Sequence, residues 1–403
     1  MKILLGGVPF GRNNIGDEAI LACVVKIVRE AAPGAELTVS TDDPATAGRL
    51  GVNVCPLFGF DVIPYSEEEM RAVMGRHDVY IWSGATGLSD YPDRACELLA
   101  AARQAHCRRI VWNVGMNTEL NPAKYKLRGK RLAVAALADR VSAGLFSVQS
   151  RLEDKMEAAA RAGLKQELMD CRLVVTRDPE SAREVARCGL PASRVVVGAD
   201  SALIQDATPW PLESLNPADI LRLEKPGIRR VALCVSAQRE ITRWPELVST
   251  LDRILELPNV ELVGLPMNPI TDLEILLRLQ KAVKNPEAFH VIAGVTEPAD
   301  ITALAARMDV IISSRLHLLI LGSIHHVPLI GISRGSKVDN FLEPFGVKAV
   351  GSVESCDFGA LVRETNRLLN EGQAFRELSQ TVRAGLLERL DRARALLRAE
   401  LAS

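Results

Sequence analysis

The stretch DVIISSRLHLLILGSIHHVPLIGIS, residues 309–333, shows most clearly how this chain is built. Its apolar run 309–314 predicts a buried strand, residues 316–325 a helix, and residues 327–333 a second strand. A strand, a helix and a second strand in this order are typical of a parallel βαβ unit. The stretch therefore predicts a parallel α/β protein.

The junction between that first strand and the helix holds the polar residues of the stretch. Ser313 or Ser314 can cap the helix, and Arg315 and His317 flank its first turn. A capping serine, a guanidinium and free backbone N–H groups together form a compact anion site. An arginine left unpaired at a buried strand end is energetically costly, which favours a bound anion there. A histidine beside it can exchange protons near neutral pH. The alternative is a core histidine, which is the role we assign to the histidine pair at the far end of the helix.

The same alternation of strand and helix extends outward in both directions. Before it, strands are predicted at 1–7, 35–41, 78–84, 108–115, 172–178 and 194–200, and helices at 17–32, 93–106, 129–169 and 179–188. A second series has strands at 229–238, 260–266 and 289–294 and helices at 246–257, 272–283 and 298–308. Four prolines in 208–227 indicate a linker between the two series.

A chain of 403 residues exceeds the size at which one hydrophobic core stops growing, so two domains are expected. We predict two Rossmann-like domains that face a cleft, at 1–210 and 228–352, joined by a linker at 211–227. A helical region at 353–403 follows. In such sheets ligands bind beyond the carboxyl ends of the strands, so the strand-to-helix junctions are the candidate sites.

The amino-acid composition argues against a nucleic-acid-binding, metal-binding or membrane-spanning protein. The 49 basic and 50 acidic residues give a net charge of -1, which provides no global field to hold nucleic acid. The eight cysteines are at least 11 residues apart, which predicts buried thiols in a reducing compartment and no metal site. The longest stretch without charged residues, 316–333, contains Pro328 and three histidines and is interpreted as a helix and a strand rather than a transmembrane segment. We expect a cytoplasmic protein.

Three further junctions are candidate sites. The first, residues 6–20, has four glycines before Asp17 and Glu18; its alternative interpretation is a glycine turn with Asp17 as the helix cap. The second, residues 82–90, is a loop of small residues. The third places Arg177 at the end of a strand, where it can hold an anion or simply pair with Asp178 on the surface.

Several cations follow the strands of the second series. Arg239, Arg315, Arg334 and Lys337 are predicted at the ends of successive strands. Because these ends meet at one edge of a parallel sheet, the cluster suits a small ligand with several negative charges. Phosphoenolpyruvate and a nucleotide diphosphate both fit that description.

At these residues the chain resembles the polysaccharide pyruvyl transferase family. The matching segments are 14–20, residues 176–178 with Ser181, residues 314–317, and residues 327–333 with Lys337. Their order and spacing agree over roughly residues 1–350, and the first and last segments are specific only in combination. Two departures, in loop 83–87 and at residues 334–336, leave the acceptor sugar open.

The resemblance implies a GT-B-like fold and a transferase that moves the pyruvyl group of phosphoenolpyruvate onto a cell-surface sugar, forming a ketal. Phosphoenolpyruvate is then a co-substrate, with no other cofactor and no metal, and the partner is a carbohydrate acceptor, a lipid-linked one included. His317 is the candidate acid and Asp17 the candidate base. The donor would be bound on the C-terminal domain and the acceptor on the N-terminal domain. The implied donor-binding residues are Arg315, Ser314, Arg177, Arg239 and Lys337, and the acceptor-binding residues are Asn14, Gly16, Gly84 and Thr86.

Two other functions remain open from the residues. A GT-B-like glycosyltransferase would share the fold and the cation cluster but bind a nucleotide sugar. A sugar-binding protein without catalysis is suggested by the altered 83–87 loop. The sequence is also compatible with an oligomer.

Overall fold

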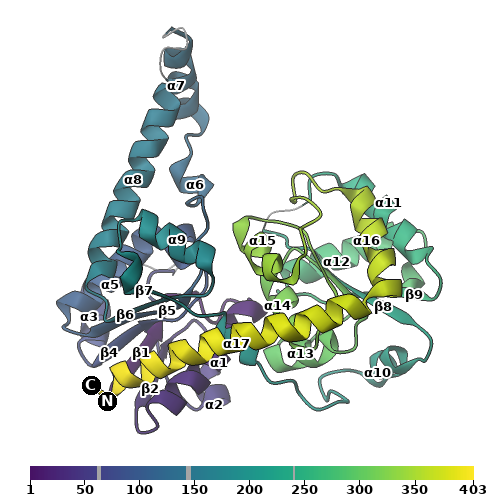
Figure 1. Ribbon diagram of the computed structural model, residues 1–403, viewed down its shortest axis with the longest axis horizontal. Coiled ribbons are helices and arrows are strands. Elements are labelled where there is room, and N and C mark those ends of the chain that lie inside the picture. Colours follow the sequence, from purple (N-terminus) through teal and green to yellow (C-terminus); the bar gives the residue numbers. More distant parts are fainter. Residues whose placement is uncertain (61–64, 142–146, 239–240) are drawn as a thin grey trace.

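The computed structural model describes residues 1–60, 65–141, 147–238 and 241–403. Two parallel sheets form two domains, with the C-terminal helix running across both (Figure 1). The first sheet has the order β3-β2-β1-β4-β5-β6-β7 and the second the order β10-β9-β8-β11-β12. Both follow the Rossmann arrangement, in which the strand order reverses beside the first strand. The prediction of two Rossmann-like domains is confirmed.

The N-terminal domain alternates strands with helices. Its strands are β1 Lys2–Gly6, β2 Glu36–Ser40, β3 Asn53–Cys55, β4 Val79–Trp82, β5 Arg108–Val114, β6 Leu173–Thr176 and β7 Val195–Val197. Its helices are α1 Ile15–Ala31, α2 Thr46–Leu50, α3 Glu67–Met74, α4 Gly87–Asp90, α5 Pro92–Gln104, α6 Pro122–Tyr125, α7 Gly129–Val141, α8 Val148–Met169 and α9 Pro179–Arg187, with short 3-10 helices at Ala192–Arg194 and Ser201–Ile204.

The C-terminal domain repeats the pattern with fewer strands. After α10 Pro217–Glu224, which lies within the predicted linker, come β8 Arg229–Cys234, α11 Trp244–Leu255, β9 Val260–Gly264, α12 Thr271–Ala282, β10 Phe289–Val291, α13 Pro298–Ala305, β11 Val310–Ser313, α14 Leu316–Ile324, β12 Leu329–Gly331 and α15 Ser336–Leu342. Two helices end the chain, α16 Phe358–Glu371 and α17 Gln373–Ala402.

The central strands are apolar along their length because helices cover both faces of each sheet. In β1, Ile3 and Leu5 are fully buried and pair with β2 on one side and β4 on the other. In the second sheet β11 lies between β8 and β12, with Ile311 opposite Ala232 and Leu329. The strand order reverses between β1 and β4 and between β8 and β11, so a ligand crevice is expected at both places.

Helix α17 joins the two domains. It begins beside the C-terminal sheet and ends against the N-terminal one, near the start of the chain (Figure 1). Leu390 and Leu397 are fully buried, and Nη1 of Arg108 on β5 donates to the carbonyl oxygen of Glu400 at 3.0 Å. The 30-residue helix therefore limits how far the domains can separate.

Helices α7 and α8 form an arm that projects from the N-terminal domain (Figure 1). The sequence predicted a single helical region here, 129–169, whose residues 142–146 lie outside the described part of the chain. Across the described ranges, every helix is too short or too polar to span a bilayer. The charge-free stretch 316–333 contains α14, which has nine residues, and the strand β12.

Candidate functional site

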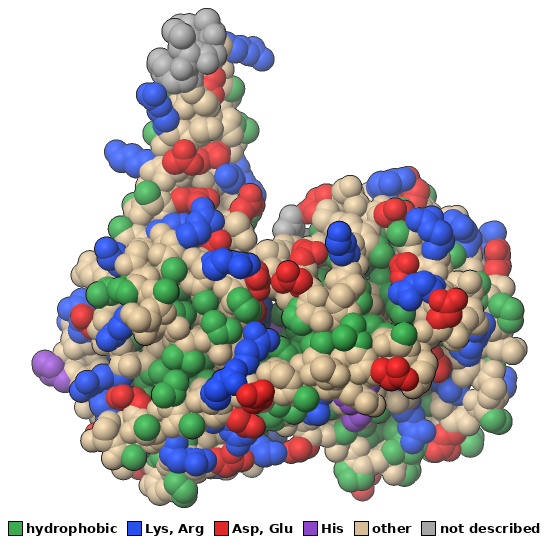
Figure 2. All heavy atoms as spheres, in the orientation of Figure 1, with side chains coloured by type: hydrophobic (Ala, Val, Ile, Leu, Met, Phe, Trp, Pro, Cys, Tyr) green, Lys and Arg blue, Asp and Glu red, His purple; other side chains and the backbone are tan. Residues whose placement is uncertain are grey.

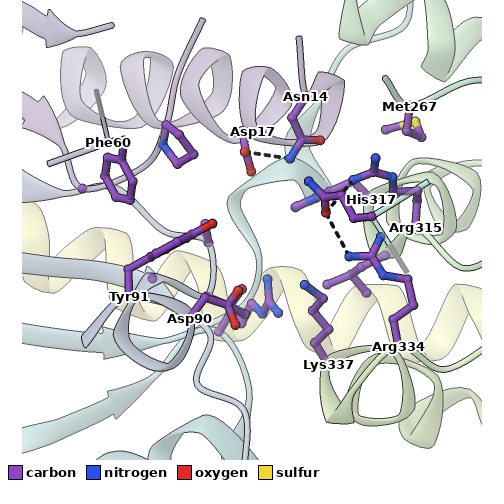
Figure 3. Close-up of a pocket in the computed structure, with 18 of the residues that line it drawn as sticks. Asn14, Asp17, Phe60, Asp90, Tyr91, Met267, Arg315, His317, Arg334 and Lys337 are labelled. Carbon is purple, nitrogen blue, oxygen red and sulfur yellow. Dashed lines mark hydrogen bonds between the residues drawn. The ribbon is translucent and has the colours of Figure 1, made fainter. Parts of the chain in front are cut away.

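A cavity of about 140 Å³ lies where the two switch points face each other. Figure 3 shows its walls: Phe60 and Tyr91 come from the N-terminal domain, and Arg315, His317, Arg334 and Lys337 from the C-terminal domain. Eight of the sequence-predicted site residues line this cavity, namely Asn14, Asp17, Thr86, Arg177, Ser314, Arg315, His317 and Lys337. The fold therefore brings together residues that are up to 323 positions apart.

Three predicted residues are not among the described residues that line the cavity. Gly84 packs against the side chain of Ile20 and is not among the lining residues. Gly16 faces the imidazole of His317 and forms the floor beneath it. Arg239 lies outside the described residues.

The first turn of α1 delivers a carboxylate to the cavity. Asn14 is the N-cap: its Oδ1 accepts from the N–H of Gly16 at 3.3 Å, and its Nδ2 donates to Oδ2 of Asp17 at 2.7 Å. The interpretation of Asp17 as the cap is therefore wrong, because Asn14 occupies that position. Burial raises the pKa of Asp17, and the nearby side chains of His317, Asn14, Lys337 and Arg315 oppose that rise.

Glycine is required just before this turn. Gly7 has a φ of +80°, and a Cβ there would overlap with the indole ring of Trp82 on β4. The backbone of the loop therefore packs directly onto that ring. Gly7 itself lines the cavity beside Asn14 and Asp17.

The β11–α14 junction differs from the sequence prediction. Arg315, not a serine, occupies the N-cap position, and no side chain caps the helix. The hydroxyl of Ser313 accepts from the N–H of Arg315 at 2.9 Å, and that of Ser314 accepts from the N–H of Ser236 at 2.9 Å. Ser313 thus braces the turn itself and Ser314 ties it to the segment after β8, so neither serine caps α14.

Arg315 has a buried partner within the protein. Its Nε and Nη2 donate to the two carboxylate oxygens of Asp272, on α12, at 2.9 and 2.7 Å. The Asp272 side chain is fully buried. The expectation that Arg315 lacks a protein anion is wrong, because Asp272 makes a bidentate contact with its Nε and Nη2 side. Nη1 remains, 3.5 Å from Oε1 of Gln238.

Sequence reasoning missed Asp272 because it was interpreted only as the start of a helix. Its position in the first turn of α12 did carry a signal, since acidic residues are common there for electrostatic reasons. The long-range pairing with Arg315, 43 residues away, has no local signature.

Arg177 is also buried and paired. Its Nη1 donates to Oδ2 of Asp200 at 3.2 Å, and its Nε lies 3.5 Å from Oδ2 of Asp178. The alternative of an Arg177–Asp178 pair on the surface is wrong, because Asp178 also caps α9 and the Arg177 side chain is 5% exposed. Arg177 therefore lines the cavity while its guanidinium is held in a buried ion pair with Asp200.

Asp200, at the end of β7, connects Arg177 to His317. Nε2 of His317 lies 3.7 Å from Oδ2 of Asp200, which is too far for a hydrogen bond but close enough for Asp200 to attract the imidazole when it carries a proton on both nitrogens. Burial alone would raise the pKa of Asp200, but His317, Arg177 and the N–H of Ala202 lower it to about 2. Asp200 was missed because it follows an ordinary strand and the residue pattern around it is unremarkable.

The two ring nitrogens of His317 have different surroundings. Nε2 is buried on the Asp200 side, whereas Nδ1 lies over Gly16, where a Cβ would overlap with it. A carboxylate on one nitrogen orients the ring so that the other can act on a ligand. His317 and Asp200 come from different domains, so Asp200 can orient the His317 ring only when the two domains are in contact.

Lys337 and Asp90 face each other across the cavity (Figure 3). Burial lowers the pKa of Lys337 to about 8; Asp90 and Asp17 oppose this, whereas Arg334 and Arg177 add to it. Asp90 accepts from Thr86 at 2.5 Å and from Asn117 at 3.1 Å. Asp90, Phe60 and Tyr91 are lining residues that sequence reasoning did not single out.

Within the described ranges, no group of three or more His, Cys, Asp or Glu residues is arranged to hold a metal ion. All eight cysteines are free thiols, and six of them are buried. Burial raises the pKa of the Cys23 and Cys234 thiols, so these side chains stay protonated.

Residues 14–336 match the family model described as polysaccharide pyruvyl transferase. No curated protein matches the sequence. Among solved structures, the chain resembles a putative UDP-N-acetylglucosamine 2-epimerase from Listeria monocytogenes, with 12% identity over 94% of this chain and 90% of that one and a TM-score of 0.62. It also resembles HepE of Anabaena, solved in complex with UDP-glucose, with 13% identity, 100% and 99% coverage and a TM-score of 0.59. A glycosyltransferase from Rickettsia africae shares 12% identity over 100% of this chain and 97% of that one, with a TM-score of 0.56. At these identities the likeness concerns the fold alone, which is GT-B-like.

Proposed function

The chain belongs to the polysaccharide pyruvyl transferase family, and from this premise we propose that it moves the pyruvyl group of phosphoenolpyruvate onto a sugar as a ketal. The observation that carries the proposal is that Asp17 and His317, from opposite domains, line one cavity together with Lys337 and Arg315. An acid, a base and cations for a small anion are the groups that this reaction needs.

The reaction balances without a redox partner. A proton adds to the methylene carbon of phosphoenolpyruvate, and its second carbon becomes oxocarbenium-like. Two sugar hydroxyls form two C–O bonds to that carbon, and the C–O bond to phosphate breaks. The two hydroxyls lose two protons: one balances the proton placed on carbon and the other leaves with phosphate.

The residues divide these tasks between the domains. In this proposal His317 protonates the methylene carbon from Nδ1, while Asp200 attracts the opposite side of the ring. Asp17 accepts the hydroxyl proton, and the raised pKa of its buried carboxyl makes it a better base. Lys337 and Arg315 attract the carboxylate and phosphate of the donor. Because Asp272 accepts from Nε and Nη2 of Arg315, the side of the guanidinium that carries Nη1 and the second Nη2 hydrogen is the side left for the donor.

Two subsites follow from this division. The donor would lie against α14 and α15, and the sugar against Thr86, Asp90 and the aromatic side chains of Phe60 and Tyr91. These rings pack edge to face at 5.3 Å, and Tyr91 is 39% exposed. An exposed aromatic face beside a carboxylate suits a sugar, whose C–H face is apolar and whose hydroxyls are donors.

The test compares His317→Ala with His325→Ala, which changes the other end of the same helix. Phosphoenolpyruvate should raise the melting temperature of both variants, because an acid acts on the transition state more than on ground-state affinity. Release of phosphate in the presence of acceptor should disappear only in His317→Ala. Full turnover in His317→Ala would remove its role as the acid.

The same melting assay with UDP-sugars tests the alternative of a nucleotide-sugar glycosyltransferase. HepE, which has this fold, was solved with UDP-glucose. Stabilisation by UDP-sugars and not by phosphoenolpyruvate would reject pyruvyl transfer in favour of that alternative.

A further inference from the structure

The arm formed by α7 and α8 begins at the mouth of the cavity. The loop between β5 and α6 is held there by Asn121, whose Nδ2 donates to the carbonyl oxygen of Asp90 at 3.0 Å. The N–H of Thr118 donates to the hydroxyl of Ser336 in the other domain at 3.4 Å. From this point the chain leads through α6 into α7, so the arm rises from the edge of the sheet that carries the site (Figure 1).

Helix α7 presents an exposed surface that is both basic and apolar. We define the α7 patch as Arg128, Lys130, Arg131, Val134, Leu137 and Arg140, all of which are exposed. Val134 and Leu137 are 69% and 63% exposed and lie about one helical turn apart. Single exposed apolar side chains are ordinary on a protein surface, so it is the position of these two beside four cations that distinguishes them.

The α7 patch has little acid to neutralise it. Residues 128–140 contain four cations and one carboxylate, Asp139. That carboxylate accepts hydrogen bonds from the Ser147 hydroxyl and the Val148 N–H at the start of α8. Figure 2 shows both basic and acidic side chains along the arm, and residues 128–169 together contain eight cations and five carboxylates. The surface therefore carries a local positive charge, although the net charge of the chain is -1.

We propose that the α7 patch docks the protein on an anionic membrane surface. Lysine and arginine side chains are attracted to anionic lipid headgroups, and valine and leucine side chains enter the boundary between headgroups and acyl chains. A second copy of this chain is the less favoured occupant. A two-fold pairing of the α7 patch would place four cations opposite four cations.

Docking through α7, at the far end of the arm, would turn the arm toward the bilayer, with the mouth of the cavity at the base of the arm. A carbohydrate whose far end is anchored in lipid could then enter between the domains. The proposal concerns where the protein works, and its test does not depend on the reaction proposed above.

The experiment is co-sedimentation of the full chain with lipid vesicles. Phosphatidylcholine vesicles are compared with mixed phosphatidylcholine and phosphatidylglycerol vesicles, at low and high salt. The wild type should bind only the anionic vesicles, and high salt should weaken binding because it screens the cations. Each cation near an anionic surface contributes about fivefold to partitioning, so Lys130→Gln/Arg131→Gln/Arg140→Gln should bind about 100-fold more weakly.

A second variant and two controls complete the test. Val134→Ser/Leu137→Ser should bind about tenfold more weakly, because two apolar side chains no longer leave water. The apolar control is Leu221→Ser, at a position that is 70% exposed on α10. The charge control is Arg183→Gln/Arg363→Gln/Arg392→Gln, whose side chains are 61–71% exposed and lie off the arm. Both controls should bind as the wild type does.

Three results would overturn the proposal. The first is no sedimentation of the wild type with anionic vesicles. The second is equal binding by the α7 variants and the controls. The third is a dimer in sedimentation velocity that the α7 variants abolish, without any vesicle binding, since the α7 patch would then be a self-interface.

Discussion

The buried ion pair between Asp272 and Arg315 is expected to stabilise the C-terminal domain through its pairing rather than through either residue alone. The two side chains are 0% and 8% exposed, and two charge-assisted hydrogen bonds of 2.7 and 2.9 Å join them. Replacing one partner leaves the other charge buried without compensation. Asp272→Asn and Arg315→Met should each therefore cost about 3–5 kcal/mol of stability.

The double variant Asp272→Asn/Arg315→Met removes both charges at once. Its loss of stability should be smaller than the sum of the single losses by about 2–3 kcal/mol, because neither charge is left unpaired. For a unit of this size 1 kcal/mol corresponds to roughly 2–4 °C, so each single variant should melt roughly 10 °C below the wild type.

The assay is thermal unfolding followed by circular dichroism, with Arg49 and Glu297 as a control pair. That pair is 3.2 Å apart but is 33% and 45% exposed, so breaking it should cost less than about 1 kcal/mol. Additive losses in the double variant, or an Asp272→Asn loss as small as that of the control pair, would refute the reasoning.

Two further predictions concern the surroundings of His317. Gly16→Ala places a Cβ where Nδ1 of His317 lies and should lower turnover about 100-fold. The control is Gly48→Ala, at a glycine with open space around it, which should leave turnover unchanged. Equal activity of the two variants would contradict the contact between Gly16 and His317. The pKa of Asp200 is lowered to about 2, so the stability it provides is present above its unfolded pKa and is lost as the pH falls toward 2. Between pH 5 and pH 3 this group should account for about 1 kcal/mol of the loss in urea unfolding, and Asp200→Asn should lose correspondingly less over that interval.

The sequence determined the architecture and the junctions that carry polar residues. Apolar runs such as 309–314 and 327–333 must be buried strands because both of their faces are covered, and this pattern is local enough to be seen in the residues. The predicted ends of the helices were less exact. The first helix has Asn14 as its N-cap and begins at Ile15, two residues before its predicted start. Capping depends on which side chain reaches a backbone N–H, and several polar residues compete for that role.

Only the tertiary structure decided which charges satisfy one another. Arg315 finds Asp272, Arg177 finds Asp200, and His317 lies between Asp200 and Gly16, each through a contact between elements far apart in the chain. The α7 patch likewise became apparent only when α8 was seen to cover one side of α7. Residue type establishes that a buried arginine needs an anion, but which anion lies within reach depends on how two sheets and their helices pack, and that is a property of the whole chain.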